Sequence, residues 1–308
     1  MKAIRVKLFQ EIASYRTPLT FGQRMTYPLP PYSTVIGMVH NLCNFTEYKE
    51  MNISIQGKYI SKAREYFTRH EFSTGLTDDK KVVCKDCSAI TGYNNKKEPV
   101  CKKCNSKNVE VLHEVRGGLI KGIGTAGIIQ SKYLYGEGAL MTEEEREITK
   151  DKYVNIIFGP AEEEILVNTE LMIHIIPKDQ SLLDAIKEAF LYPRVYPSLG
   201  RHEDLAIIKE VKIVNVNKRS PDKDIHLDET VAAYIPFEMV EDVYLKGTGN
   251  MDRSGIIYHL NKDYKLEKIG QGITRVWNTK KVLYVTNIVI SEEDEVLLDE
   301  DNNVVFAA

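Results

Sequence analysis

Residues 171–216 read LMIHIIPKDQSLLDAIKEAFLYPRVYPSLGRHEDLAIIKEVKIVNV, and this stretch decides the fold. The run LMIHII at 171–176 has the composition of a buried strand, which Pro177 ends. Ser181 is the expected N-cap of a helix. Its inner face holds Leu183, Ile186, Ala189 and Phe190. A loop at 196–201 (YPSLGR) then leads to a strand at 205–216, so the stretch predicts a strand–helix–strand unit.

The N-terminal part of the chain predicts a second unit of this kind. Residues 3–9 alternate apolar side chains with Arg5 and Lys7, which indicates a half-buried strand with a basic outer face. Ser33 is the expected cap of a helix with one apolar face, made of Val35, Ile36, Val39, Leu42 and Cys43. Residues 53–69 favour extended chain. Two such units predict an α+β fold, a ferredoxin-like sandwich with helices on one face of an antiparallel sheet.

The rest of the chain divides around this core. The polar, lysine-rich segment 78–110 has the character of an insertion, and residues 142–150 predict a short helix with a capping box. Residues 230–290 predict short strands with a turn at Asn278-Thr279. We therefore expect a polar insertion within the core and a C-terminal part made of short strands.

The charge is unevenly distributed along the 308 residues, although the net charge is only −3. Residues 291–301 (SEEDEVLLDED) hold seven carboxylates and no base, whereas residues 1–40 hold five bases and a single acid, Glu11. Composition alone, with 43 % apolar and 28 % charged residues, is typical of a soluble globular protein. The distribution predicts a basic face with the acidic tail elsewhere.

Location and redox state follow from two further patterns. The N-terminus begins with a strand-like pattern, not an apolar signal region, and no apolar run is long enough to span a membrane. Four of the five cysteines form two tight pairs, while Cys43 stands alone on a helix pattern. We expect a cytoplasmic protein whose paired cysteines bind metal and do not form disulfides.

The cysteine spacing is the strongest motif in the sequence. Cys84-x2-Cys87 is followed by thirteen residues and then by Cys101-x2-Cys104. Two tight turns of this kind present four thiolates to one tetrahedral zinc ion and leave no open position for water. We therefore predict a structural zinc knuckle at 84–104, the alternative being four surplus thiols in a loop.

Two basic segments near the knuckle suit a phosphate backbone. Residues 80–107 hold eight lysines against Asp86 and Glu98, although a charged loop that packs on a protein partner would have the same composition. Residues 115–136 hold six glycines with Arg116, Lys121 and Lys132, and no acid. Glycines let the backbone approach phosphates closely, and a flexible hairpin crossing is the alternative. The fingerprint at Gly122–Gly127 lacks the strand and helix that a dinucleotide site needs.

No catalytic group is defined by spacing. The seven histidines are scattered; His40 and His174 fit core positions, and His202 either contacts a ligand or caps its loop.

Two ordered motif blocks carry a resemblance to a known family. The first, within residues 1–40, holds Arg16-Thr-Pro18, Thr26-Tyr27-Pro28-Leu29-Pro30-Pro31 and Ser33-Thr34-Val-Ile-Gly37-Met38. The second, within residues 171–215, holds Tyr196-Pro-Ser-Leu199-Gly200-Arg201-His202-Glu203. Together they resemble the CRISPR-associated protein five family of the repeat-associated (RAMP) superfamily.

The resemblance implies a ferredoxin-like core at 1–70 and 136–225 and a hairpin thumb inserted at 71–135, with a zinc knuckle at or near the tip of that thumb. It implies further a small C-terminal β region, which together with the acidic tail spans 226–308. It also implies binding of the 5′ handle of the guide RNA (crRNA) in a type I Cascade complex, subtype I-B-like. The implied partners are the Cascade backbone and large subunits, with target DNA near its flanking motif as a further possible contact. Single-stranded RNA needs aromatic rings for stacking and bases for phosphates. The candidate RNA-binding residues are Arg16, Arg24, Tyr27, Tyr32, Lys121, Lys132, Arg201 and His202. Tyr27 and Tyr32 have packing beneath their loop as an alternative.

Three classes of function fit these patterns to different degrees. The first is a non-catalytic RNA-binding scaffold. The second is a metal-independent endoribonuclease, for which Tyr27, His70 and Lys121 are candidates without a diagnostic arrangement. The third, a zinc-ribbon protein that acts on DNA, fits less well because the ribbon is a small insertion in a larger fold.

Overall fold

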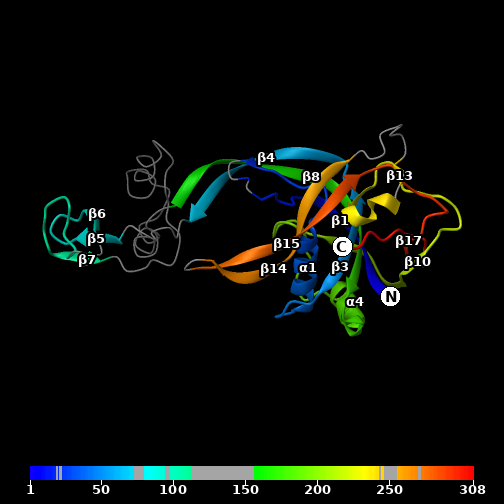
Figure 1. The fold of residues 1–308 in the computed structure, drawn as a ribbon. Coiled ribbons are helices and arrows are strands. Elements are labelled where there is room, and N and C mark those ends of the chain that lie inside the picture. Colours follow the sequence, from blue (N-terminus) through cyan, green and yellow to red (C-terminus); the bar gives the residue numbers. More distant parts are fainter. Residues whose placement is uncertain are drawn as a thin grey trace. The chain divides into compact units, whose positions relative to one another are not determined.

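The computed structural model describes residues 1–18, 20, 23–72, 80–93, 98–111, 156–242, 244–245, 255–269 and 272–308. The chain divides into two compact units (Figure 1). Unit 1 combines Met1–Glu65 with Glu163–Ala308, and unit 2 is Tyr66–Glu162. The inserted unit is therefore longer at both ends than the 71–135 expected from sequence. Residues 226–308 belong to unit 1 and do not separate as a region of their own.

One large sheet organises unit 1. Seven of its nine described strands follow the order β14-β15-β12-β3-β8-β1-β9, while β2 and β4 pair with β8. The strands are β1 (Lys2–Ala13), β2 (Gln23–Arg24), β3 (Met51–Lys58), β4 (Ser61–Phe72), β8 (Ile156–Pro177), β9 (Ile207–Asn215), β12 (Ala232–Pro236), β14 (Ile256–Ile269) and β15 (Gly272–Val285). The pairings from β14 to β9 are antiparallel.

Two helices cover one face of this sheet. Helix α1 (Tyr32–Cys43) lies between β1 and β3 in the chain, and α4 (Leu183–Leu191) lies between β8 and β9. They lie side by side in Figure 1. Their apolar faces pack on alternate residues of the strands, such as Ile4, Val6 and Ile173, in one core. The fold is thus mixed α and β and dominated by sheet. Both strand–helix–strand units expected from the hydrophobic pattern are present.

The helix starts differ from the sequence expectation. Pro31 is the N-cap of α1, in extended conformation, and no side chain caps the helix, so Ser33 lies inside its first turn. Before α4, a 3-10 turn η1 (Gln180–Leu182) is capped by Asp179, whose carboxylate accepts a hydrogen bond from the Ser181 N–H at 3.0 Å. Ser181 is therefore capped by Asp179 instead of acting as the cap.

The C-terminal segment covers part of the other face of the sheet. Its elements are β10 (Asn217–Arg219), β11 (Ile225–His226), η2 (Phe237–Asp242), β13 (Tyr244–Leu245), β16 (Ile288–Ile290) and β17 (Val296–Leu298). Val305 packs on Ala3 and Ile176, and the Phe306 N–H donates to Ser54 Oγ at 2.9 Å. The expected separation of the acidic tail from the basic outer face of the first strand is wrong. The tail folds back onto that face, where Asp299 pairs with Arg5 and both are buried.

The predicted turn at Asn278-Thr279 is also wrong. These residues lie within β15, and the hairpin between β14 and β15 turns after Ile269. The register of β14 shifts between Asn261 and Asp263, opposite Asn278 and Thr279. The polar cluster therefore marks a β-bulge, which needs the same irregular backbone as a turn.

The described part of unit 2 holds a small sheet in the order β6-β5-β7. Its strands are β5 (Lys80–Cys84), β6 (Ile90–Tyr93) and β7 (Val109–Val111). The predicted glycine-rich segment at 115–136 and helix at 142–150 lie outside the described residues. Among the helices that are described, none has the length and apolar character needed to cross a membrane.

Candidate metal centre and nucleic-acid interface

The four paired cysteines converge in unit 2. Their sulfur atoms lie within 4.8 Å of one another, with Cys84 Sγ 3.4 Å from Cys104 Sγ and Cys87 Sγ 3.6 Å from Cys101 Sγ. Thiolates bound to one tetrahedral zinc at ~2.3 Å would lie roughly 3.8 Å apart. The predicted ligand set is therefore assembled at the spacing that a metal ion requires.

The backbone around the cysteines has the same form at both pairs. Ser88 and Asn105, the residues directly after Cys87 and Cys104, have positive φ angles of 53° and 56°. The Lys103 N–H points to Cys101 Sγ at 3.4 Å. Hydrogen bonds from the Cys104 and Lys103 N–H groups to this sulfur lower the pKa of Cys101 to about 6. Burial would raise the pKa of Cys84, but hydrogen bonds from the Cys87 and Asp86 N–H groups outweigh it and lower that pKa. The first cysteine of each pair is thus favoured as thiolate, the state that binds metal.

Asp86 joins the two turns. Its carboxylate accepts a hydrogen bond from Ser106 Oγ, and one from Asn108 Nδ2 at 2.7 Å. Asp86 lies between the two cysteines of the first pair and Ser106 follows the second pair, so the two halves of the cluster are held together independently of the sulfurs. This arrangement, with its four sulfur donors, fits a metal ion bound entirely by the chain.

The two motif blocks of the sequence meet in unit 1. Gln10 Nε2 donates to the backbone oxygens of Leu199 and Asp204 at 2.8 and 3.0 Å, and the Ser14 N–H donates to Asp204 Oδ2 at 2.9 Å. Gly200 has φ +107°, and a Cβ there would lie 2.7 Å from the Ser14 oxygen. Only glycine fits this turn, because both its backbone angle and the close approach of the Ser14 carbonyl, directly after β1, exclude a side chain.

Arg24 and Arg201, from the two blocks, share one buried carboxylate. Glu163 Oε2 lies 3.5 Å from Arg24 Nη1 and 3.1 Å from Arg201 Nη1. Arg201 also pairs with Asp204, Nη2 to Oδ1, at 2.8 Å. Burial alone would lower the pKa of Arg201, but hydrogen bonds and charge from Asp204 and Glu163 outweigh it and raise the pKa. The structure brings these two predicted residues together, with their charges already paired inside the protein.

The other predicted RNA-binding residues have varied surroundings. Arg16 and His202 are exposed, and Arg16 Nη2 donates to the Thr20 oxygen at 2.9 Å. Tyr27 is half-buried, edge-on to Tyr258 with ring centroids 5.4 Å apart. Tyr32 is fully buried in the core. Base stacking by Tyr32 is therefore corrected to a packing role, since a ring without exposed surface cannot stack on RNA. Lys121 and Lys132 lie outside the described residues, as does the side chain of His70.

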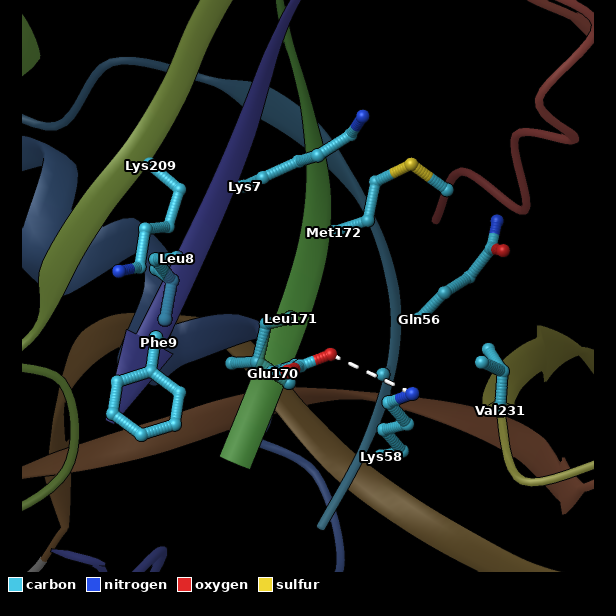
Figure 2. A pocket seen from close by; sticks show the side chains of 11 residues that line it. Lys7, Leu8, Phe9, Gln56, Lys58, Glu170, Leu171, Met172, Lys209 and Val231 are labelled. Atoms are coloured by element: carbon cyan, nitrogen blue, oxygen red, sulfur yellow. Dashed lines mark ion pairs between the residues drawn. The ribbon is translucent and has the colours of Figure 1, made fainter. Parts of the chain in front are cut away.

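A groove that the sequence did not reveal lies on the open part of the sheet face opposite the helices. Its volume is about 540 Å³, and we call it the sheet-face groove (Figure 2). Two cross-strand rows from β3, β8 and β1 form its floor. The rows are Lys58, Glu170 and Phe9, and Gln56, Met172 and Lys7. Lys209 of β9 and Val231 complete the lining.

The groove combines an aromatic ring with three ammonium groups. Lys209 Nζ lies 5.7 Å from the centroid of the Phe9 ring. Lys7 pairs with Glu210 at 3.3 Å, and Lys58 pairs with Glu170 at 3.6 Å. The alternation at residues 3–9 had placed Lys7 on the outer face. The other members come from strands far apart in the sequence, which no local pattern connects.

Fold and site together define a sheet-dominated α+β protein with an inserted four-cysteine module. A family model described as CRISPR-associated protein (Cas_Cas5) matches residues 3–276, so the chain belongs to this family. The resemblance to the CRISPR-associated protein five family is thus confirmed, and the chain takes part in CRISPR defence. No curated protein matches the chain.

The solved structures that align with this chain have low sequence identity and low structural similarity to it. One is described as "CRISPR RNA-guided surveillance complex", with 14 % identity, 93 % of this chain and 90 % of that chain covered, and a TM-score of 0.43. Another is a CRISPR protein from Archaeoglobus fulgidus, with 11 % identity, both chains covered fully, and a TM-score of 0.40. At these TM-scores the family assignment rests on the sequence match alone.

Proposed function

We propose that this chain is a non-catalytic RNA-binding subunit of a type I Cascade complex, I-B-like, that holds the 5′ handle of the crRNA. Family membership over residues 3–276 supports the CRISPR setting. The observation that carries RNA binding is the sheet-face groove, which three lysines line together with the half-buried ring of Phe9. The Cascade backbone and large subunits are the proposed partners, with target DNA near its flanking motif as a further contact.

The core of unit 1 is, in this proposal, a ferredoxin-like domain. Its strands β9, β1, β8 and β3 are adjacent in that order, and α1 and α4 connect β1 to β3 and β8 to β9. A strand–helix–strand repeat with both helices on one face is the arrangement of that fold. Its second face is then open to ligands wherever the C-terminal segment does not cover it.

A nucleotide fits the chemistry of the groove. A base can stack against Phe9, with Met172 as an apolar neighbour, because aromatic stacking accepts any base. Lys209 has no carboxylate partner among the described residues, so its ammonium is available to a phosphate. Exposed Arg16 and His202 would extend this contact along the handle, while Arg24 and Arg201 would have to exchange Glu163 and Asp204 for RNA.

Titration of handle RNA with the full chain tests this proposal. Phe9→Ala should weaken binding by about 1–3 kcal/mol through lost stacking. Lys209→Gln should lower the slope of log affinity against log salt by about one unit. Lys223→Gln, a change at an exposed lysine that does not line the groove, is the matched control. Wild-type affinity and slope in both groove variants would remove the groove from the proposal.

We also propose that the chain does not cleave RNA. Of the three candidates for cleavage, Tyr27 packs on Tyr258 and burial raises its pKa, which disfavours a role as a base. Incubation of the purified chain with its own repeat RNA should give no specific product. Specific cleavage that disappears in Tyr27→Phe, His70→Ala or Lys121→Ala would establish the endoribonuclease instead.

The ion that we propose for the four-cysteine cluster is zinc, in a structural role. Four thiolate ligands leave no position for a substrate, and zinc prefers this tetrahedral sulfur shell. When bound, zinc would hold the two turns that Asp86 already joins. Elemental analysis of protein purified without chelator should give one zinc per chain.

A further inference from the structure

The far half of the β14–β15 hairpin has little packing on the rest of unit 1. Near the sheet, Leu260 and Val282 are fully buried in the core beneath α1. Beyond the bulge at Lys262, residues 264–268 and 272–279 are all exposed on both faces of the ribbon. In Figure 1 this half extends past α1. We call residues 263–269 and 272–278 the hairpin arm. An isolated two-stranded ribbon is marginally stable in water, so an arm of this kind is suited to a ligand that covers it.

One face of the arm is rich in large apolar side chains. Tyr264 pairs across the strands with Trp277, and their rings lie 5.2 Å apart. Leu266 lies opposite Arg275, and Ile273 lies opposite Lys268. The exposed fractions are 43 % for Tyr264, 39 % for Trp277, 65 % for Leu266 and 75 % for Ile273.

The bulge determines which face these residues occupy. Leu260 pairs with Lys280 and Tyr264 pairs with Trp277, so four positions along β14 correspond to only three positions along β15. Because side chains alternate along a strand, Trp277 and Lys280 point to opposite faces. The bulge therefore turns Tyr264 and Leu266 away from the side that α1 covers.

The hairpin carries more bases than acids, in a chain whose net charge is −3. Residues 256–285 hold six lysines and arginines against Asp263 and Glu267, and three of these bases, Lys265, Lys268 and Arg275, lie in the arm with both acids. In the described part of the chain, no salt bridge involves Lys265, Lys268 or Arg275. Arg275 lies over the Tyr264 ring, with Cζ 4.7 Å from its centroid. Arg5 and Arg201, by contrast, are neutralised by buried carboxylates.

We propose that the hairpin arm binds single-stranded nucleic acid without sequence preference, as a second binding site in addition to the handle site. Trp277 and Tyr264 would stack on bases, while Lys268 and Arg275 on the same face would neutralise phosphates. Interleaved aromatic and basic side chains are the composition of single-strand platforms. A protein interface is less well matched, since lysine is depleted at such interfaces and several unpaired cations share this ribbon. RNA and DNA share the required chemistry, so either can be the ligand.

Fluorescence anisotropy with the full chain tests the arm. The probes are oligo-U RNA, oligo-dT DNA and a DNA duplex, all unrelated to the handle, each at several salt concentrations. Trp277→Ala should weaken single-strand binding about tenfold through lost stacking. Lys268→Gln and Arg275→Gln should each lower the salt slope by about one unit. Lys223→Gln is the control. The single strand that binds more tightly, RNA or DNA, identifies the ligand of the arm.

The outcomes separate this site from the handle site. Loss of oligo-U or oligo-dT binding in the arm variants, with handle binding by the groove intact, supports the arm. Trp277→Ala could loosen the ribbon. Lys268→Gln and Arg275→Gln alter only exposed side-chain ends, so they test independently whether these two cations contact phosphates. Tighter binding to duplex than to single strands would overturn the proposal. Wild-type binding of all three probes by the arm variants, with weakened assembly onto another subunit, would make the arm a protein interface.

Discussion

Arg5 and Asp299 are 294 residues apart in the sequence and form an ion pair inside unit 1. Arg5 Nη1 lies 2.7 Å from Asp299 Oδ2, and the two side chains are 4 % and 0 % exposed. Asp299 also accepts hydrogen bonds from Asn303 and lies 3.2 Å from His174 Nε2. The acidic end of the chain is thus fixed to the first strand by a buried charge pair.

Asp299→Asn should destabilise the protein by about 3 kcal/mol, since removal of one member of a buried pair leaves the other without full compensation. Arg5 keeps Asp301 and Glu210 as partners, at 2.8 Å each, which limits the loss. Urea unfolding measures the change. Asp301→Asn is the matched control, because Asp301 is half exposed and should cost less than about 1 kcal/mol. Equal losses in both variants would contradict the buried pair.

The same pair predicts how stability depends on pH. Burial would raise the pKa of Asp299, but hydrogen bonds from His174, Asn303 and Arg5 outweigh it and hold the pKa well below its usual range. A carboxylate with a lowered folded pKa stabilises the protein fully above its unfolded pKa of about 3.9, and this contribution is lost as pH falls below that value. Unfolding free energies from pH 7 to pH 2 should fall more steeply in the wild type than in Asp299→Asn. Parallel curves would contradict the assignment.

The cysteine cluster predicts a local response to metal loss. Cys84→Ser with Cys87→Ser should abolish metal binding and disorder the module around β5, while unit 1, a separate compact unit, stays folded. Cys43→Ser is the control, because Cys43 is a half-buried free cysteine in α1, outside the cluster. Elemental analysis gives the stoichiometry, and limited proteolysis locates the disorder. Global unfolding of the double variant would show that the two units depend on each other.

Local patterns predicted the elements of unit 1 because each depends on a few neighbouring residues. The apolar residues at 171–176 became part of β8, and the inner-face positions Ile186 and Phe190 of α4 are buried. The pattern also showed which side of β1 carries Arg5, but not what covers that side. The covering carboxylate lies at the far end of the chain, and no periodicity links the two.

The candidate sites also differ in whether they depend on neighbouring residues or on residues far apart in the sequence. The cysteine cluster was predictable because each Cys-x2-Cys pair is one turn, and two turns suffice to present four ligands to one metal ion. The sheet-face groove was not, because Phe9, Lys58, Met172 and Lys209 come from four strands whose order only the fold defines. The burial of the Tyr32 side chain was also not predictable, since the first residue of a helix that follows a proline can be either buried in the core or exposed at the surface.

Arg201 and Arg16 should respond differently to removal, although both are predicted handle contacts. Arg201→Ala leaves Asp204 and Glu163 buried with fewer partners, so we expect a loss of about 2 kcal/mol in the free energy of unfolding. Arg16→Ala removes an exposed charge without an ion pair in the described part of the chain, and stability should change by less than about 0.5 kcal/mol. Urea unfolding of both variants measures this contrast.

Handle titration of the same variants then separates structure from recognition. Arg16→Ala should lower the salt slope by about one unit, as should Lys121→Ala in the segment outside the described residues. Arg201→Lys is the conservative control: it keeps the charge but loses the paired contacts to Asp204, since lysine lacks the planar fork. If Arg201→Lys restores handle binding but not stability, the charge at 201 acts on RNA. If it restores neither, Arg201 serves to hold the two motif blocks together. Wild-type stability in Arg201→Ala would contradict the buried network itself.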